Sequence, residues 1–369
     1  MAESRRILIV RTDRMGDVVL STPVIRALRR AYPSAYLGMM VQPAHRDLVE
    51  GHPDLDVVIL YDKEGAQKGW LDNLRFARQL RSYRFDTAII LHSTNRVILV
   101  AWLAGIRCRI GYARRLPALL TDRIPYIKGQ GEEHELEYNL KLLGIVGIGD
   151  IIPISKEQRA GNRYCVPGML APFVPIRAEA DRRVASFLLE NGIRESAEPL
   201  VVIHPGASCP SKRWATRRFA LVADRLVDQH GARILVLTGP EEKGQGAEVL
   251  RQMQRPAIAA LGLFAVGELA PLFRRARCLV SNDSGPVHIA GAVGTPVVSI
   301  FGRWGGGLSP RRWGPVGPNG LALHHDIGCR PCLAHRCTIG FTCLEAVTVE
   351  EVLAAVEYVA GLKGTESGK

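Results

Sequence analysis

The segment NDSGPVH at residues 282–288 combines residue types that could bind a phosphorylated ligand. Asp283 supplies a carboxylate, Ser284 a hydroxyl and His288 an imidazole, directly after an apolar run that predicts a strand. Gly285 would let the backbone approach a ligand closely, and the N–H groups that open the following helix would favour a phosphate. The simpler interpretation, that Asp283 or Ser284 only caps this helix, does not explain so many polar residues at one strand end.

Two further segments place polar residues at the ends of apolar runs. HPGASCPSKRW at 204–214 puts Lys212 at the entrance of an expected helix, where an ammonium could clamp a diphosphate. TGPEE at 238–242 puts Glu241 where a carboxylate could accept hydrogen bonds from ribose hydroxyls. The alternatives are a solvated basic surface for Lys212 and a favourable helix-dipole position for Glu241. Together the three segments predict an enzyme that handles a phosphorylated ligand.

The turn after the first apolar run, VRTDRMGDVVLSTP at 10–23, is charged. It lacks the G-x-G-x-x-G pattern that lets a dinucleotide approach the backbone, which disfavours an NAD-linked dehydrogenase. Its one glycine, Gly16, is expected to make the turn. Asp17 follows at the predicted strand end, where it is either a helix N-cap or a functional carboxylate.

Apolar runs alternate with helical patterns along most of the chain, which predicts two doubly wound parallel sheets. The expected strands are 6–10, 35–41, 56–60, 86–91, 107–111, 200–204, 233–238, 277–281 and 296–301. The expected helices are 17–31, 69–82, 95–104, 133–144, 179–191, 215–229, 241–253, 284–293 and 347–362. In the last helix, Thr348 and Glu351 have the spacing of a capping box.

A Pro- and Gly-rich stretch without clear periodicity, residues 150–176, predicts a linker. The expected domains are therefore 1–172 and 173–369, which fits the usual domain size for 369 residues. Ligands of doubly wound sheets lie beyond the carboxyl ends of the strands, and in a two-domain protein these ends can face a central cleft.

The net charge of +12 favours a phosphate-rich or otherwise anionic partner: nucleic acid, a membrane surface or an anionic substrate. An ordinary arginine-rich enzyme is the alternative. The N-terminal apolar run is too short for a signal peptide, and VILVAWLAGI at 97–106 is about half the length of a membrane span. A cytoplasmic protein with mostly reduced cysteines is therefore expected, with any membrane contact peripheral.

Three other features have more than one interpretation. Asp54-Leu55-Asp56 resembles a metal-binding D-x-D but leads directly into a strand, so a solvated turn is favoured. The basic and aromatic stretch 107–129 could contact an acceptor, a membrane surface or nucleic acid, or be a solvated surface. A cluster of four cysteines could hold a structural zinc ion, although its second pair is irregularly spaced; reduced thiols or a labile disulfide are the alternatives. These cysteines are Cys329, Cys332, Cys337 and Cys343.

Four segments, taken in chain order, resemble the ADP-heptose:lipopolysaccharide heptosyltransferase family, glycosyltransferase family 9. They are GDVVLSTP, HPGASCPSKRW, TGPEE and NDSGPVHIAGAVGTPVVSIFG. The second-heptose type is the most similar in appearance. The resemblance implies a GT-B fold of two Rossmann-like domains, with the acceptor mainly on the first and the sugar nucleotide mainly on the second. It implies inverting transfer of heptose from ADP-L-glycero-D-manno-heptose to the lipopolysaccharide inner core, without a metal or other cofactor for the chemistry.

The same resemblance implies roles for particular residues. Asp17 would be the general base, since an inverting displacement needs a carboxylate to take the acceptor proton; Asp13 is the competing candidate. Acceptor-binding residues would be Arg11, Arg14 and Gly16, the arginines facing anionic groups of a glycolipid. Donor-binding residues would be Lys212 on the phosphates, Glu241 on the ribose, Asp283 on the sugar, and Ser284, Gly285 and His288 near the pyrophosphate. The cysteine cluster would not be catalytic.

Other functions remain open at this point. A related enzyme could use another nucleotide sugar or another glycan. A zinc-containing basic protein that binds nucleic acid would have to explain the strand-end motifs as coincidence. The favoured partners are a nucleotide sugar, an anionic glycolipid and the cytoplasmic face of the inner membrane, without nucleic acid.

Overall fold

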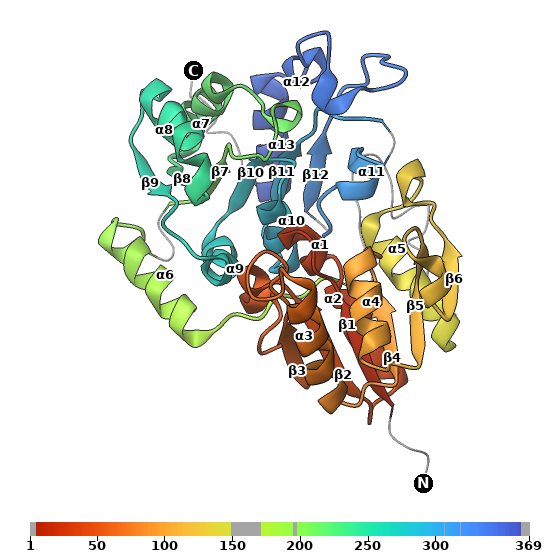
Figure 1. Ribbon diagram of the computed structural model, residues 1–369. Coiled ribbons are helices and arrows are strands. Elements are labelled where there is room, and N and C mark those ends of the chain that lie inside the picture. The colour runs from red at the N-terminus through yellow and green to blue at the C-terminus, as the bar shows by residue number, and fades with distance from the viewer. Residues whose placement is uncertain (1–4, 149–170, 195–197, 306, 318, 363–369) are drawn as a thin grey trace. The chain divides into compact units, whose positions relative to one another are not determined.

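The computed structural model describes residues 5–148, 171–194, 198–305, 307–317 and 319–362. It contains two α/β units, each built on a six-stranded parallel sheet (Figure 1). The first unit comprises described residues 5–129, 135–148 and 171–175, and the second comprises the others. The predicted linker at 150–176 falls mainly outside the described residues. The short segment 130–134 groups with the second unit, which the sequence did not indicate.

The sheet of the first unit has the strand order β3-β2-β1-β4-β5-β6, with every neighbouring pair parallel. Its strands are β1 (Arg6–Val10), β2 (Tyr36–Val41), β3 (Val57–Leu60), β4 (Thr87–Ile90), β5 (Cys108–Ala113) and β6 (Asp122–Pro125). Its α-helices are α1 (Met15–Val19), α2 (Thr22–Ala31), α3 (Trp70–Ser82), α4 (Asn95–Leu103) and α5 (Glu135–Lys141).

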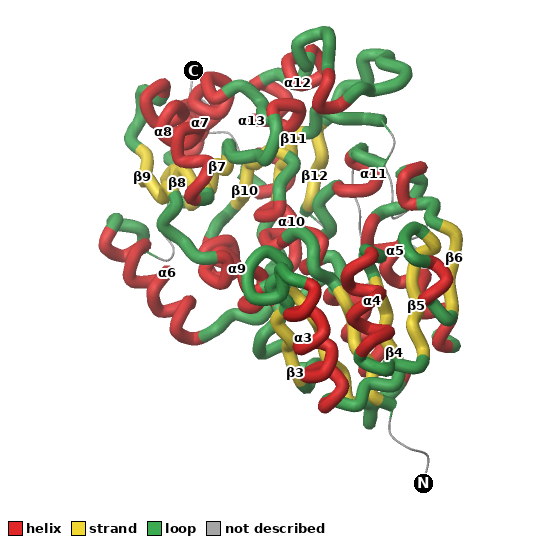
Figure 2. The backbone as a smooth tube through the Cα atoms, viewed as in Figure 1, coloured by secondary structure: helices red, strands yellow, loops and turns green. Residues whose placement is uncertain are grey.

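Helices cover both faces of this sheet (Figure 2), and the apolar side chains on both faces are buried. Leu8 and Val10 belong to the core formed with α3 and α4. Ile7 and Ile9 alternate with them and are also fully buried, so they point toward the opposite face. A continuous apolar strand such as RILIV therefore forms because both of its faces are covered.

The sheet of the second unit has the order β12-β11-β10-β7-β8-β9 and is also parallel. Its strands are β7 (Leu200–His204), β8 (Arg233–Thr238), β9 (Ala257–Leu261), β10 (Cys278–Asn282), β11 (Val297–Ile300) and β12 (Gly320–Leu323). Its α-helices are α6 (Ala178–Glu190), α7 (Thr216–His230), α8 (Lys243–Gln252), α9 (Val266–Arg275), α10 (Gly285–Ala292), α11 (Pro310–Trp313), α12 (Thr342–Glu345) and α13 (Val349–Ala360).

The predicted α/β class with two doubly wound parallel sheets is confirmed. In each sheet the strand order reverses once, between β1 and β4 in the first unit and between β7 and β10 in the second. The connections on either side of such a switch point leave in opposite directions and open a crevice at the carboxyl ends of these strands. The charged turn after β1 and the NDSGPVH segment after β10 both lie at a switch point.

Candidate active site

The first unit holds a buried charge network centred on Arg11, the first residue after β1. The Arg11 guanidinium donates hydrogen bonds to Asp13 (Nε to Oδ1, 2.7 Å), to Asp17, and to Glu135 Oε1 and Asn139 Oδ1, both at 3.0 Å. Arg11 is 2% exposed. Arg11 was predicted to bind the acceptor, but its guanidinium is occupied by partners within the unit. It holds in place the carboxylate of Asp17, the predicted base.

Asp17 lies in the first turn of α1 and is 8% exposed. The residue before the helix is Arg14, so the alternative that Asp17 is merely an N-cap is wrong. Burial and the negative charge of Asp13 raise the pKa of Asp17 to about 6, although the positive charge of Arg11 opposes the shift. A carboxylate with this pKa is a suitable general base near neutral pH.

Asp13 pairs with His92, which follows β4 on the neighbouring strand of the switch point. His92 Nδ1 lies 2.6 Å from Asp13 Oδ2, and the His92 side chain is 33% exposed. Burial acts to raise the pKa of Asp13, but Arg11 and His92 outweigh it and lower the pKa to about 2. Asp13 is therefore ionised at every pH of interest and is a much weaker base than Asp17.

Residues more than 100 positions after β1 complete the network: Lys128, and Glu135 and Asn139 of helix α5. Lys128 Nζ donates to Glu135 Oε1 at 2.7 Å and to Asn139 Oδ1 at 3.2 Å. Asn139 Nδ2 in turn donates to Leu20 O at 3.2 Å, which ties α5 to the end of α1. The network thus pairs three carboxylates with two cations, Arg11 and Lys128. The carboxylates are those of Asp13, Asp17 and Glu135.

The other predicted acceptor residues lie beside this network. Arg14 is exposed and directly precedes α1. Gly16 is buried inside α1 and does not have a positive φ, so the expectation that it makes the turn is wrong. The turn is instead made by Thr12 to Arg14, in extended or bent backbone between β1 and α1.

In the second unit, two buried cations meet one buried carboxylate after β10. Lys212 Nζ lies 2.9 Å from Asp283 Oδ2, and Arg303 Nη2 lies 2.7 Å from the same oxygen. The exposed fractions are 8% for Lys212, 6% for Arg303 and 6% for Asp283. Burial acts to raise the pKa of Asp283, but Lys212 and Arg303 outweigh it and lower the pKa. The cluster carries an excess positive charge at the N-terminus of α10, an arrangement that suits an anion.

Two nitrogens of this cluster have no hydrogen-bond partner among the described residues. They are Arg303 Nε and His288 Nδ1, and both are buried. Burial lowers the pKa of His288 to about 3, so its imidazole is neutral. Because buried polar groups are normally paired, these two nitrogens are candidate contacts for a ligand.

The end of β7 joins this cluster through hydrogen-bonding side chains. His204 Nδ1 lies 3.1 Å from Ser281 Oγ and 3.4 Å from Ser284 Oγ. Ser284 precedes α10 but its side chain makes no capping hydrogen bond in the described structure, so the alternative that Ser284 is only a cap is not supported. Burial lowers the pKa of His204 to about 4, so it is neutral as well.

Of the two adjacent glutamates Glu241 and Glu242, it is Glu242 that lies beside the end of β7. Glu242 Oε2 lies 3.8 Å from His204 Nε2, and a Cβ on Gly206 would be 2.4 Å from the same oxygen. Burial raises the pKa of Glu242. Glu241 is exposed on the short 3-10 helix Pro240–Glu242. Sequence reasoning therefore chose the more exposed of two adjacent glutamates.

Asn282, the last residue of β10, fixes the loop that carries Lys212. Its Oδ1 accepts a hydrogen bond from the Trp214 backbone N at 3.0 Å, and its Nδ2 donates to Pro205 O at 2.7 Å. Asn282 is fully buried. The β7 and β10 ends are thus held in register around the cation pair.

The four cysteines of the predicted zinc site line one pocket of the second unit. As their side chains stand, no group of three or more His, Cys, Asp or Glu within the described ranges is arranged to hold a metal ion. The D-x-D alternative is not supported either, because Arg29 hydrogen-bonds to Asp56 Oδ2 and to the backbone oxygen of Asp54.

Several residues of both sites were missed in the sequence. His92 stands two residues after β4 and Arg303 three residues after β11, so both carry the same strand-end signal that identified Asp17 and Asp283. Lys128, Glu135 and Asn139 lie in KGQGEEHELEYN, which gives no such signal, because only the fold brings α5 beside β1. In chemical terms, the first unit offers a buried carboxylate with a raised pKa, and the second a buried cluster with excess positive charge.

Comparison with known proteins identifies the family of the chain. The family model described as glycosyltransferase family 9 (heptosyltransferase) matches residues 73–342. Lipopolysaccharide heptosyltransferase 3 of Escherichia coli is 25% identical over 294 residues, 78% of this chain and 80% of that protein. Other curated relatives are named heptosyltransferases 1 and 2, so the type is not fixed by similarity.

Solved structures have the same fold over nearly the whole length. The glycosyltransferase family 9 protein from Veillonella parvula DSM 2008 has a TM-score of 0.83 at 24% identity, covering 98% of this chain and 99% of that chain. The E. coli heptosyltransferase WaaC with ADP has a TM-score of 0.68 at 18% identity, covering 96% and 99%. The fold is therefore GT-B, and the chain belongs to glycosyltransferase family 9, the heptosyltransferase family.

Proposed function

We propose that this glycosyltransferase moves heptose from ADP-L-glycero-D-manno-heptose to the inner core of lipopolysaccharide, with inversion at the anomeric carbon. The observation that carries the proposal is the buried Lys212–Asp283–Arg303 cluster at the start of α10, with its two unpartnered nitrogens. The E. coli relatives solved with ADP and with ADP-2-deoxy-2-fluoro heptose support a nucleotide-sugar donor.

The donor diphosphate would lie against Lys212 and Arg303, with the N-terminus of α10 directed at it. The ammonium of Lys212 and the guanidinium of Arg303 would offset the negative charge that builds on the ADP leaving group as the glycosidic bond breaks. Ser284, Gly285 and His288 would contact the same phosphates. Asp283 would turn from its cations to hydroxyls of the sugar, and Glu241 or its neighbour Glu242 would hold the ribose.

Asp17 would act as the general base. An acceptor hydroxyl attacks the anomeric carbon in one displacement, the bond to the diphosphate breaks, and Asp17 takes the hydroxyl proton. Single displacement inverts the anomeric configuration. Arg11 would orient the Asp17 carboxylate, and the exposed Arg14 would bind an anionic group of the acceptor. Lys212 and Arg303 supply the charge that a metal would otherwise supply, so we propose that no metal takes part in transfer.

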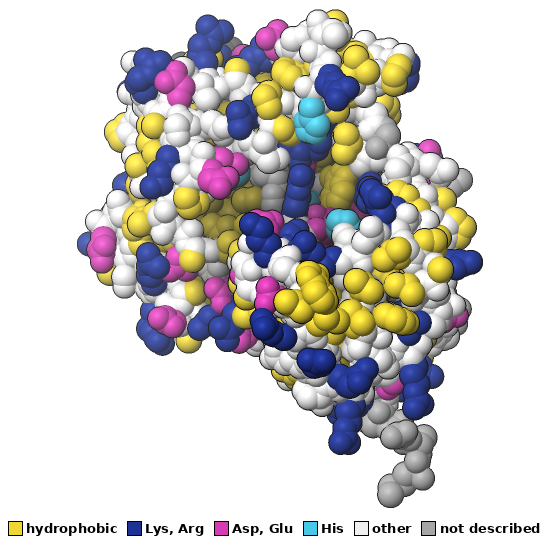
Figure 3. All heavy atoms as spheres, in the orientation of Figure 1, with side chains coloured by type: hydrophobic (Ala, Val, Ile, Leu, Met, Phe, Trp, Pro, Cys, Tyr) yellow, Lys and Arg dark blue, Asp and Glu magenta, His cyan; other side chains and the backbone are white. Residues whose placement is uncertain are grey.

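The acceptor is a glycolipid, so we also propose that the enzyme is cytoplasmic and binds the cytoplasmic face of the inner membrane. Hydrophobic side chains gather over α4 on the face shown in Figure 3, with Lys and Arg side chains around them. On this surface, here named the α4 patch, Leu99 is 39%, Trp102 48% and Leu116 41% exposed. Four exposed arginines lie near these residues in the sequence: Arg96, Arg107, Arg114 and Arg115.

Exposed tryptophan and leucine beside arginines suit the headgroup region of an anionic bilayer. In the described part of the chain, no helix is long and apolar enough to cross a membrane. The α4 patch would therefore lie on the surface of the bilayer and keep the first unit near its lipid-linked acceptor.

The test is release of ADP by purified enzyme mixed with ADP-heptose and heptose-deficient lipopolysaccharide, in the presence of EDTA. Acceptor-dependent release that EDTA does not inhibit is expected. Release that occurs equally without acceptor, or only after metal is restored, would contradict the proposed acceptor or the proposed chemistry. Absence of release with ADP-heptose but release with another nucleotide sugar would contradict the donor.

A further inference from the structure

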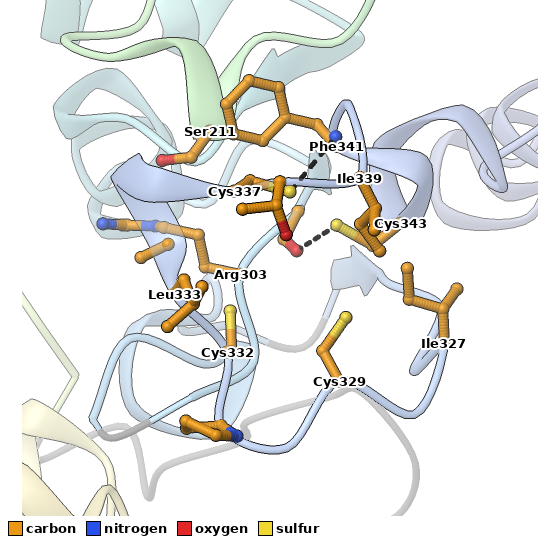
Figure 4. A pocket seen from close by; sticks show the side chains of 14 residues that line it. Ser211, Arg303, Ile327, Cys329, Cys332, Leu333, Cys337, Ile339, Phe341 and Cys343 are labelled. Atoms are coloured by element: carbon orange, nitrogen blue, oxygen red, sulfur yellow. Dashed lines mark hydrogen bonds between the residues drawn. The ribbon is translucent and has the colours of Figure 1, made fainter.

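A pocket of the second unit is surrounded by all four cysteines of the C-terminal cluster (Figure 4). The pocket has a volume of about 90 Å³. We propose that it binds one thiophilic divalent metal ion, zinc or iron, through the thiolates of Cys329, Cys332, Cys337 and Cys343. This site is separate from the transfer chemistry proposed above, which needs no metal.

The four side chains converge on one space. Cys329 and Cys332 point from one loop toward Cys337 and Cys343 across the pocket (Figure 4). Because the thiols do not yet stand at ligand positions, binding would draw the segment together around the ion.

The sulfur atoms already receive the kind of hydrogen bonds that support metal thiolates. Cys332 Sγ receives hydrogen bonds from the backbone of Trp304, Gly305 and Ala334. Phe341 N donates to Cys337 Sγ at 3.3 Å. Such outer contacts orient ligands and stabilise the charged form of the thiol. Four thiolates with this support suit tetrahedral zinc or iron.

The segment around the pocket has little regular secondary structure. Residues 327–343, all of them described, contain one short 3-10 helix, Ala334–Arg336, and the start of α12. Three of its large apolar side chains are well exposed: Ile327 at 37%, Leu333 at 52% and Ile339 at 48%. Short segments that cannot build a core are commonly held together by a metal or by disulfides.

This segment packs directly against residues of the anion site. A Cβ on Gly305 would be 2.8 Å from Cys332 Cβ, and Cys343 Sγ donates a hydrogen bond to Gly302 O at 2.6 Å. His335 Nδ1 also lies 3.1 Å from Ser211 Oγ. Arg303 and Lys212 are the immediate neighbours of Gly302 and Ser211. A metal in the pocket would therefore hold the backbone that positions both cations, a consequence that rests on the proposed function.

Metal binding can be measured on the whole enzyme without any activity assay. The metal content of protein purified under reducing conditions would identify zinc or iron. The apoprotein would then be titrated with Co²⁺, whose thiolate charge-transfer and visible bands report tetrahedral sulfur ligation. We expect one equivalent bound, with affinity reduced in Cys332→Ser and in Cys337→Ser by more than the roughly 10–100-fold typical of losing an outer contact. Cys108→Ser, which changes a cysteine of the first unit, should bind like the wild type.

Three outcomes would overturn the proposal: no saturable Co²⁺ binding, a spectrum without thiolate bands, or equal loss of affinity in Cys108→Ser. A second measurement tests the effect on the anion site. Amide hydrogen exchange at residues 302–305 should slow on metal binding in the wild type but not in Cys337→Ser. If Co²⁺ binds to the cysteines and this exchange does not change, the metal site stands and its link to Arg303 is wrong. Neither measurement depends on whether ADP-heptose is the donor.

Discussion

Arg11 and Asp17 form a buried ion pair at the carboxyl end of β1, and the same guanidinium donates to Asp13 at 2.7 Å. Arg11 and His92 keep Asp13 strongly acidic, whereas burial and the charge of Asp13 raise the pKa of Asp17 to about 6 against the opposing charge of Arg11. Two aspartates four residues apart are thus given different chemical roles by their surroundings.

Asp17→Asn should nearly abolish transfer and leave donor binding intact. The amide keeps the size of the side chain but cannot take a proton, and a general base contributes about 10²–10⁴-fold to rate. Steady-state kinetics should show this loss in kcat, while calorimetry gives an unchanged Kd for ADP. Asp54→Asn, at a partly exposed carboxylate of the same unit, is the matched control and should be fully active. A fully active Asp17→Asn would exclude Asp17 as the base.

The pH profile should report the raised pKa of Asp17. Because the carboxylate must be ionised to act, kcat/KM should fall as the pH drops through about 6. The negative charge of Asp13 contributes to that raised value, so Asp13→Asn should move the acidic limb to lower pH. A limb that stays in place, or moves to higher pH, would show that the titrating group is not coupled to Asp13.

Removing Arg303 should weaken ADP binding, although its role was not evident in the sequence. A hydrogen bond to a charged group contributes about 1.5–3 kcal/mol, so Arg303→Ala should raise the Kd for ADP about 10–100-fold. Arg303→Lys should restore part of the affinity. Arg251→Ala removes an exposed arginine of the same unit that pairs with Glu248 and should have no effect. Unchanged ADP affinity in Arg303→Ala would place the phosphates elsewhere.

Replacing an aromatic residue of the α4 patch should weaken membrane binding. Trp102→Glu removes apolar burial worth roughly 1.5–3 kcal/mol and adds a repelled charge, so binding to phosphatidylglycerol vesicles should fall at least about 10-fold. Flotation with vesicles measures this directly. Leu221→Glu, at a residue of α7 that is 41% exposed, should bind like the wild type. Equal effects of both substitutions would mean that the α4 patch has no particular role.

Asn282→Ala should destabilise the second unit. It leaves the Trp214 N–H and the Pro205 carbonyl buried without their partner, at about 1–3 kcal/mol for each group. The urea midpoint of the second unit should fall accordingly, whereas Asn191→Ala at the partly exposed end of α6 should have a small effect. Similar midpoints for the two variants would show that Asn282 does not hold the β7 and β10 ends together.

Much of the fold follows from patterns that are local in the sequence. Continuous apolar strands such as RILIV and LVVIH were predictable because both faces of a parallel sheet are buried. The capping box of Thr348 and Glu351 is confirmed, since its hydrogen bonds span only three residues. Three strands were missed: β6, β9 and β12. The exposed DRIP of β6 and the half-buried AIAAL of β9 lack the strong apolar signal.

The helix expected at 17–31 is two helices, α1 and α2. Pro23 has no backbone N–H and stands in the first turn of α2, where the missing donor costs nothing. The break lets Ser21 and Leu20 meet Asn139, an interaction across 118 or more residues that no local pattern reveals. The same is true of the burial that raises the pKa of Asp17. Residue types at strand ends indicated where the sites lie, but only tertiary contacts determine which charges are paired.

The most direct measurement is the mass of heptose-deficient lipopolysaccharide after incubation with ADP-L-glycero-D-manno-heptose and the enzyme. The wild type and Asp54→Asn should add one heptosyl residue, and Asp17→Asn, folded and still able to bind ADP, should add none. No added heptose with active, ADP-binding wild-type enzyme, or full addition by Asp17→Asn, would contradict heptose transfer by a base at Asp17.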